Sequence, residues 1–322
     1  MKQVQRCLIA VGMFALAGAA AAQGKFPDGP VKMIVPFAPG GGVDGAGRLI
    51  ARQLQAGLNV PVVVENRAGA SGTIGGRAVH AAAADGQTLL FSASTHVLAN
   101  QVLAAPPYDP VGDFAAVARV GEAPLLMVIA PNLPQRNLGE VLAAVRQRPE
   151  QWVAALPALG AASHLATLLL AKQGNLTLTM TPYKGTAPAL TDVAGGHVQI
   201  LVDSIISLSP LAKGGKVKAI ASTGAKRASV MPDVPTAAES GLPGLVYSSW
   251  YGVWAPKSTA PERVQLLNKA FNQAVADLTK SGALAQIGVE PVTESVEQFR
   301  KFIAADVAQA GDLLKGAGFK PE

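Results

Sequence analysis

The residues with the clearest chemical potential are three glycines that follow an apolar run and precede an amphipathic stretch. Gly40, Gly42 and Gly45 have the G-x-G-x-x-G spacing of dinucleotide-binding turns, and Glu65 follows where a ribose-binding acid is expected. Asp44 argues against a nucleotide, because its carboxylate would lie beside a pyrophosphate and repel it. Two prolines flanking the turn, at positions 36 and 39, weaken the dinucleotide interpretation further.

The glycine turn also has a more general property. A glycine-rich turn at the start of a helix presents backbone N–H groups and the positive end of the helix dipole, and both attract anions. Residues 38–45 therefore indicate an anion site, and the alternative is a tight strand-to-helix turn without a ligand.

No other pattern in the sequence indicates catalysis. GASGT at residues 69–73 lacks the last glycine of a hydrolase nucleophile elbow. The four histidines (His80, His96, His164 and His197) show no paired spacing typical of a zinc site. Cys7 is the single cysteine, so a disulfide framework or a cysteine-based metal site is excluded. We expect a non-enzymatic protein with no metal and no cofactor.

The elements that must position the glycine turn alternate between short apolar strands and helical stretches. This alternation is typical of parallel βαβ units whose sheet faces are both covered. It predicts an α/β fold with more than one sheet. The expected strands are 31–37, 60–65, 88–92, 125–130, 152–155, 176–180, 198–202 and 217–221, and the expected helices are 43–58, 138–146, 164–172, 187–194, 261–278 and 294–314.

The N-terminus has the pattern of a cleaved export signal. Lys2 and Arg6 precede fifteen uncharged residues, 8–22, which end in the A-x-A site at 20–22. The run is shorter than the ~20 residues that a membrane-spanning helix needs. We expect residues 1–22 to form a signal peptide that is cleaved after Ala22.

Composition limits the classes of partner. Hydrophobic residues make up 49% and charged residues 15%, which excludes a disordered chain. Without Lys2 and Arg6, 25 basic and 21 acidic residues leave a charge of +4. The basic excess is scattered and contains no run that could follow a phosphate backbone, so we expect no nucleic acid. A mild positive charge favours small anions.

The longer motifs resemble the Bug family, the TctC-like extracytoplasmic solute receptors of tripartite tricarboxylate transporters, and they do so in the family's order over essentially the whole mature chain. The motifs are VPFAPGGGVDGAGRLIARQL (35–54), VVVENRAGASGTIG (62–75), DGQTLLF (85–91), PYDPVGDF (107–114), PYKGTAPALTDVAGGHVQI (182–200), KAIASTGAKRASVMPDVPTAAESGLPG (218–244) and SSWYGVWAP (248–256).

The resemblance implies a type II-like periplasmic binding protein. It has two α/β lobes, each built on a mixed or parallel sheet with helices on both faces, and a hinge between the lobes that closes on a ligand. The expected division is 23–125 plus 246–322 for the first lobe and 126–245 for the second, with crossings at 125–130 and 249–255. The implied role is capture of a small organic carboxylate in the periplasm by a monomer that delivers it to a membrane permease.

The resemblance also implies ligand-binding positions in the loops that face the cleft. They are Pro39, Gly40, Gly41, Gly42, Asp44, Ser94, Thr95, His96, Gly160, Ala161, Ser163, His164, Lys184, Gly185 and Asp203.

Alternatives stay open for several of these positions. Lys184 either faces the cleft or is a solvated surface lysine, and His96 and His164 either bind the ligand or orient their loops. For Asp44 we favour a capping role at the following helix. Asp203 bonds loop N–H groups, or it accepts from a ligand amine or an ordered water.

Two departures from the family pattern bear on the ligand. Residues 156–163 read LPALGAAS where the family has mostly hydroxyl and amide side chains, and Val43 stands where threonine is common. Fewer side-chain donors remain for a second carboxylate, and an unpaired buried charge is costly. We therefore expect a ligand with one carboxylate and an apolar body. There are two alternatives to a transport receptor. One is an exported sensor that presents its ligand occupancy to a membrane histidine kinase, and the other is a periplasmic enzyme.

Overall fold

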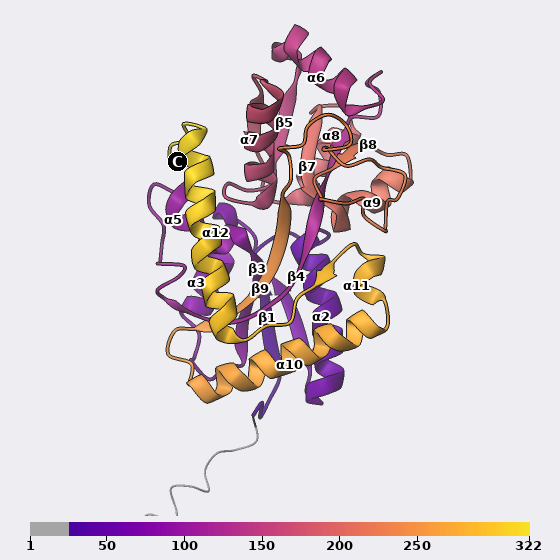
Figure 1. Ribbon diagram of the computed structural model, residues 1–322. Helices are drawn as coiled ribbons and strands as arrows, with labels where there is room; N and C mark the ends of the chain where they lie inside the picture. Colours follow the sequence, from indigo (N-terminus) through magenta and orange to yellow (C-terminus); the bar gives the residue numbers. More distant parts are fainter. Residues whose placement is uncertain (1–25) are drawn as a thin grey trace, which may run out of the picture.

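The computed structural model describes residues 26–322, so the expected signal peptide lies outside the described residues. Two groups of strands, one above the other in Figure 1, form the framework, and helices flank both groups. The strands β4 and β9 run through the middle of the molecule between the two groups.

The first sheet has the order β2-β1-β3-β9-β4, with the short β10 also paired to β4. Its first three strands are parallel to one another, and the pairs β3–β9, β9–β4 and β10–β4 are antiparallel. The strands are β1 (Val31–Val35), β2 (Val62–Asn66), β3 (Thr88–Ala93), β4 (Phe114–Ile129), β9 (Ser248–Pro256) and β10 (Glu290–Pro291).

The second sheet continues from β4 in the order β4-β7-β5-β6, and β8 also pairs with β4. The pairs β5–β6 and β5–β7 are parallel, whereas β4–β7 and β4–β8 are antiparallel. These strands are β5 (Val153–Leu156), β6 (Thr179–Pro182), β7 (Ile200–Ser204) and β8 (Lys218–Ser222). The predicted α/β fold with two mixed sheets is confirmed, and the sheets share one strand.

The shared strand changes partner in its middle. Pro124 still pairs with Ser248 of the first sheet, whereas Leu125 pairs with Ser204 of the second. The expected crossing at 125–130 therefore belongs to the second sheet, and the expected crossing at 249–255 pairs entirely within the first. On the return path Tyr247 is still bound to the second lobe, because its N–H donates to the carbonyl of Thr223, the residue after β8.

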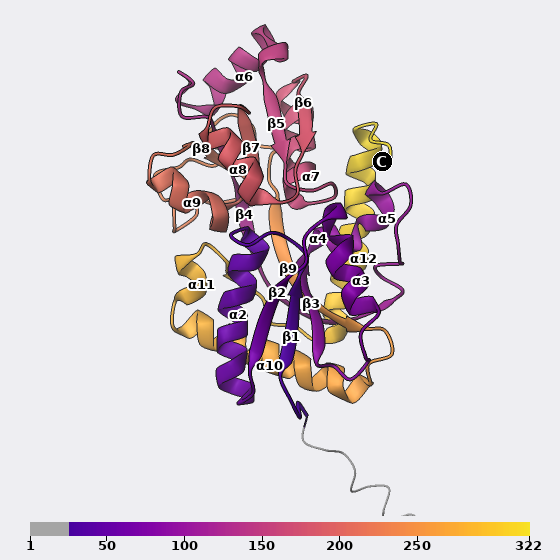
Figure 2. The ribbon, with the colours of Figure 1, turned by 180° about the vertical axis from the view of Figure 1, so that it is seen from behind.

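Two amphipathic helices of the first lobe follow the sequence pattern closely. α2 (Gly42–Leu58) buries Ala46, Ile50 and Leu54, and α10 (Pro261–Lys280), which starts with proline at its first turn, packs against α2 and β4. Figure 2 shows α2 beside the first sheet with α10 across its lower end. α12 (Val296–Gly316) begins at a capping box between Ser295 and Gln298.

The remaining helices are shorter. They are α3 (Thr73–His80), α4 (Ser94–Val97), α5 (Ala99–Val102), α6 (Leu138–Gln147), α7 (Ala162–Gly174), α8 (Thr186–Ala194), α9 (Ile205–Lys213) and α11 (Ala283–Gln286), with 3₁₀ turns at Ala70–Gly72 and Pro149–Gln151. Within residues 26–322 no helix combines the length and apolar character needed to cross a membrane.

The two lobes also share part of their core. α7 of the second lobe packs against α12, and Leu165 of α7 lies in the same buried cluster as Phe299, Ile303 and Trp254 of the first lobe. The lobes are therefore in contact both through the shared strand and through this helix pair.

Candidate functional site

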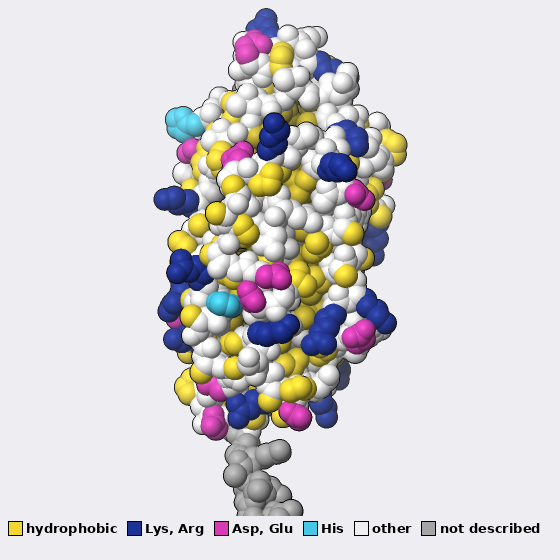
Figure 3. Space-filling view, turned by 90° about the vertical axis from the view of Figure 1, so that its left-hand side faces the viewer, with side chains coloured by type: hydrophobic (Ala, Val, Ile, Leu, Met, Phe, Trp, Pro, Cys, Tyr) yellow, Lys and Arg dark blue, Asp and Glu magenta, His cyan; other side chains and the backbone are white. Residues whose placement is uncertain are grey.

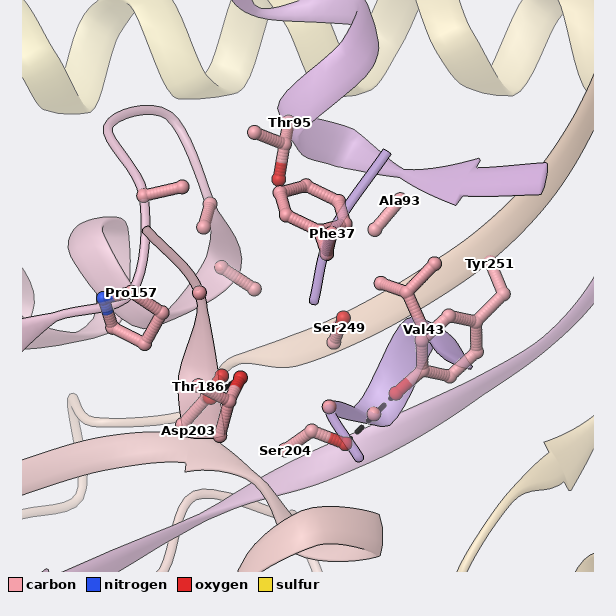
Figure 4. Close-up of a pocket in the computed structure, with 16 residues that line it drawn as sticks. Phe37, Val43, Ala93, Thr95, Pro157, Thr186, Asp203, Ser204, Ser249 and Tyr251 are labelled. Carbon is pink, nitrogen blue, oxygen red and sulfur yellow. Dashed lines mark hydrogen bonds between the residues drawn. The ribbon is translucent and has the colours of Figure 1, made fainter. Parts of the chain in front are cut away.

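A cavity of about 40 Å³ lies between the two lobes, at the ends of β1, β3 and β7 and the starts of α2, α7 and α8 (Figure 4). These are the carboxyl ends of strands, where α/β proteins usually bind ligands. The lining residues are Phe37, Gly41, Gly42, Val43, Ala93, Thr95, Pro157, Ala158, Ala161, Ala162, Gly185, Thr186, Asp203, Ser204, Ser249 and Tyr251.

The first-lobe loop presents the start of α2 to this cavity. Gly41 is the N-cap and has extended backbone angles, so the N–H groups of Gly42 and Val43 belong to the first turn, where intrahelical acceptors are absent. Neither group has an acceptor within the described part of the chain. Two unpaired donors and the positive end of the helix dipole therefore meet at the cavity.

Asp44 holds this loop in place and does not line the cavity. Its carboxylate accepts hydrogen bonds from the Gly40 N–H at 3.0 Å, from Arg48 at 3.0 Å and from the Asn66 amide at 2.9 Å. Burial raises the pKa of Asp44, but the hydrogen bonds from Arg48, Gly40 and Asn66 outweigh burial and lower that pKa overall. Gly40 has φ +85°, so the turn favours glycine there.

The two lobes lie close together at the glycines of this turn. A Cβ atom on Gly42 would lie 2.5 Å from the Ser204 hydroxyl and 3.2 Å from the Tyr251 hydroxyl. A Cβ atom on Gly41 would lie 3.5 Å from the hydroxyl of Thr186. Ser204 and Tyr251 are hydrogen-bonded to each other at 2.8 Å, as Figure 4 shows. Glycine is therefore required at position 42 for this closed arrangement.

Asp203 is the one charged side chain among the lining residues. It is buried, and its Oδ2 accepts a 2.6 Å hydrogen bond from the Thr186 hydroxyl. Burial raises the pKa of Asp203, and the hydrogen bonds from Thr186 and from the backbone of Ser204 only partly oppose that rise. Without a cation in the lining, a bound anion depends on backbone N–H groups and hydroxyls.

The second-lobe loop presents the start of α7. Ala161 is its N-cap, and Ala162 lines the cavity beside it. His164 faces away from the cavity: its Nδ1 accepts from the Gly160 N–H at 3.2 Å, and its ring packs edge-on against Phe319. Burial lowers the pKa of His164 to about 4, so the ring is neutral and orients the loop.

The loop after β3 places one of its three expected residues at the cavity. Thr95 lines the cavity, whereas His96 packs against Tyr108, Phe114 and Trp254. Burial lowers the pKa of His96 to about 3, which keeps the imidazole neutral. Ser94 is buried and its hydroxyl has no partner in the described structure.

The structure thus divides the expected binding residues into two groups. Those in the cavity lining are Gly41, Gly42, Thr95, Ala161, Gly185 and Asp203. Those outside the lining are Pro39, Gly40, Asp44, Ser94, His96, Gly160, Ser163, His164 and Lys184. Lys184 has an exposed side chain, and Ser163 is fully buried with a hydroxyl that has no partner among residues 26–322.

Several lining residues were not predicted. Thr186 directly follows the Tyr-Lys-Gly motif, and Ser249 and Tyr251 lie in the quoted block 248–256, so the motifs contained a signal for these three. The apolar positions Phe37, Ala93, Pro157 and Ala158 carry no chemical signal in the sequence. Within residues 26–322 no three His, Cys, Asp or Glu side chains come together as a metal site.

The fold and the cavity between its lobes define a periplasmic-binding-protein architecture, and the comparisons with known proteins agree. Residues 47–319 match the family model described as the tripartite tricarboxylate transporter family receptor. The chain is 39% identical over 320 residues to Protein BugT of Bordetella pertussis, with 98% of each chain covered.

Solved structures show the same likeness. An R. palustris protein solved with adipate is 33% identical with a TM-score of 0.89, over 92% of this chain and 100% of that one. MatC from Rhodopseudomonas palustris, solved with bound malate, is 32% identical with a TM-score of 0.83, over 90% and 100%. The protein belongs to the TctC family of tripartite tricarboxylate transporter receptors, and it is a solute-binding receptor and not an enzyme.

Proposed function

We propose that this receptor is exported to the periplasm, where its signal peptide is cleaved after Ala22. There the monomer captures a small carboxylate between its lobes and delivers it to a tripartite tricarboxylate transporter permease. The observation that carries the proposal is the pair of helix starts at the cavity, α2 and α7, whose first-turn N–H groups face a space without a cationic side chain. Such N–H groups bind a carboxylate through charge-assisted hydrogen bonds.

The ligand we propose has one carboxylate and an apolar body. The relatives above hold adipate and malate, which are dicarboxylates. Here Phe37, Val43, Ala93 and Pro157 line the cavity, and no cationic side chain lines it that could pair with a second carboxylate. A second charge without a partner would cost several kcal/mol, so binding of a monocarboxylate is favoured.

The lobes we propose are residues 23–125 with 246–322 and residues 126–245, and they open and close about β4 and the segment before β9. The partner change at Pro124 and Leu125 supports a hinge there. The close approach of Gly42 to Ser204 is consistent with a closed form, and ligand entry then requires the lobes to separate.

Calorimetric titration tests the proposal. The purified receptor is titrated with a series of monocarboxylates, such as benzoate, nicotinate and short-chain fatty acids, and with citrate, malate and adipate. We expect at least one monocarboxylate to bind at least tenfold more tightly than every dicarboxylate and tricarboxylate. Tight citrate or malate binding without any monocarboxylate binding would overturn the ligand class, and binding of no carboxylate at all would overturn the function.

A further inference from the structure

A second and much larger hollow lies on the first lobe, away from the cavity between the lobes. We call it the α12 groove; its volume is about 630 Å³. This size falls within the range of small-molecule sites. The lining residues are Val97, Val111, Phe114, Ala115, Ala116, Trp254, Lys257, Arg300, Ile303, Ala304 and Val307.

The floor of the α12 groove is apolar and firmly packed. Trp254 is 1% exposed, Phe114 and Ile303 are each 4% exposed, and both aromatic rings pack against the ring of His96. One wall carries Val111, which is 53% exposed and is one of the few large apolar side chains open to solvent. A preformed apolar hollow of this kind favours a hydrocarbon group over water.

Two cations line the groove where β9 ends and α12 begins. Lys257 directly follows β9, and Arg300 lies in the second turn of α12, which starts near the end of β9 in Figure 1. Both side chains are exposed, and neither forms an ion pair with another residue of the described chain. On this face Figure 3 shows hydrophobic side chains exposed near Lys and Arg side chains in the lower half of the molecule.

The opposite end of the groove is apolar. Val307 lies seven residues beyond Arg300 along α12, which corresponds to roughly 10 Å of helix, and its backbone carbonyl is occupied by the amide of Gln101. Val97 of α4 and Ala304 also line this hollow. The groove therefore has a cationic head end and an apolar channel behind it.

We propose that the α12 groove is a second binding site, which takes an amphiphilic carboxylate with a medium-length hydrocarbon chain. The carboxylate lies between Lys257 and Arg300, and the chain lies over Trp254 and Ile303 toward Val307. An inorganic anion lacks the apolar group that the floor favours, and a neutral alcohol lacks the charge that the head end favours.

The site is distinct from the cavity between the lobes, although one short helix contributes to both. In α4, Thr95 lines the cavity and Val97 lines the groove. None of the groove residues lines the cavity, so variants in the groove test this site separately from the proposed receptor function.

Equilibrium dialysis with radiolabelled octanoate tests the second site. We expect saturable octanoate binding. It should weaken roughly tenfold in a Lys257→Gln/Arg300→Gln variant, because the carboxylate loses its contacts with two solvent-exposed cations. Ala304→Trp fills the groove and should weaken binding at least tenfold. Lys301→Gln is the matched control: it removes one charge from the same helix, where Lys301 pairs with Glu297, and should leave octanoate affinity unchanged.

Two further binding measurements distinguish the groove from the cavity between the lobes and test the need for a carboxylate. Gly42→Val disrupts the cavity between the lobes, because its side chain collides with Ser204 and Tyr251. Octanoate binding that survives in this variant but not in Ala304→Trp places the octanoate in the groove. Octanol should bind at least tenfold more weakly than octanoate. Unchanged octanoate affinity in both groove variants, loss of all octanoate binding in Gly42→Val, or equal affinity for octanol would each overturn the proposal.

Discussion

The hydroxyl of Thr186 donates a 2.6 Å hydrogen bond to Oδ2 of Asp203, and both side chains face the cavity between the lobes. The backbone of Ser204 also donates to this carboxylate, but the two hydrogen bonds only partly oppose the effect of burial. Because burial raises the pKa of Asp203, its protonated form is available at higher pH than that of an exposed aspartate. A protonated Asp203 donates to a carboxylate, whereas an ionised Asp203 repels it.

The first prediction concerns the pH dependence of binding. Monocarboxylate affinity should increase as pH falls toward the raised pKa of Asp203, because binding favours the protonated form of this side chain. Asp203→Asn should bind at least as tightly as the wild type at pH 8 and should lose most of this pH dependence. Calorimetric titration across the pH range measures both. Weaker binding by the variant at every pH would instead indicate that ionised Asp203 accepts from a donor group on the ligand.

The second prediction concerns lobe closure at Gly42. Gly42→Val places side-chain atoms where Ser204 and Tyr251 already lie, so the closed form should be disfavoured and ligand affinity should fall at least tenfold. Gly57→Ala in the same helix is the control, since a Cβ there meets nothing within 4 Å. Calorimetry and small-angle scattering with and without ligand compare the two. An unchanged affinity in Gly42→Val would contradict the role of this contact.

The third prediction concerns the loop that Asp44 holds. Asp44→Ala leaves the Gly40 N–H, Arg48 and Asn66 without their shared acceptor, and the free energy of unfolding should fall by about 1–3 kcal/mol. Ligand affinity should fall as well, because the start of α2 loses its fixed position. Asp312→Ala, an exposed acid on α12 whose carboxylate has no hydrogen-bond or ion-pair partner among the described residues, should change stability by less than about 0.5 kcal/mol. Equal urea denaturation midpoints for the two variants would contradict this role.

The fourth prediction concerns the two buried histidines. Burial lowers the pKa of His96 to about 3 and that of His164 to about 4, so their ring proton NMR signals should not titrate between pH 8 and 5. The unfolded chain takes up a proton near pH 6.5 at each site and the folded protein does not. Each histidine should therefore reduce stability as pH falls below 6.5, by roughly 2 kcal/mol at pH 5. A ring signal of either residue titrating near pH 6.5 would contradict their buried, neutral state.

Periodicity predicted the regular elements well where one face is clearly apolar. The helix expected at 43–58 is α2 at Gly42–Leu58, and the strand expected at 31–37 is β1 at Val31–Val35. The first half of β4, residues 114–124, was not predicted, because alanines, Arg119, Gly121 and Pro124 give it neither alternation nor a continuous apolar run. This segment pairs with β9, whose residues lie more than 120 positions further along the chain, so a local sequence pattern does not reveal the pairing.

The cavity was predicted less completely than the fold. The glycine turn was located because its function depends on backbone conformation, which glycine spacing reveals. His96 could not be assigned from sequence, since a core imidazole and a ligand-binding imidazole have the same letter; only packing against Phe114 and Trp254 distinguishes them. Tyr251 lies on β9 of the first sheet and Ser204 on β7 of the second. Their hydrogen bond exists only in the folded chain, so no local sequence pattern predicts it.

The most direct measurement is a titration of ¹⁵N-labelled receptor with the tightest-binding carboxylate found by calorimetry, followed by amide NMR. If the two helix starts hold the carboxylate, the largest downfield proton shifts should occur at the first-turn N–H groups of Gly42, Val43 and Ala162, with smaller changes at the amides of Lys184 and Ser94. If those three amides keep their shifts while amides outside the cavity respond, the backbone of the two helix starts does not hold the ligand.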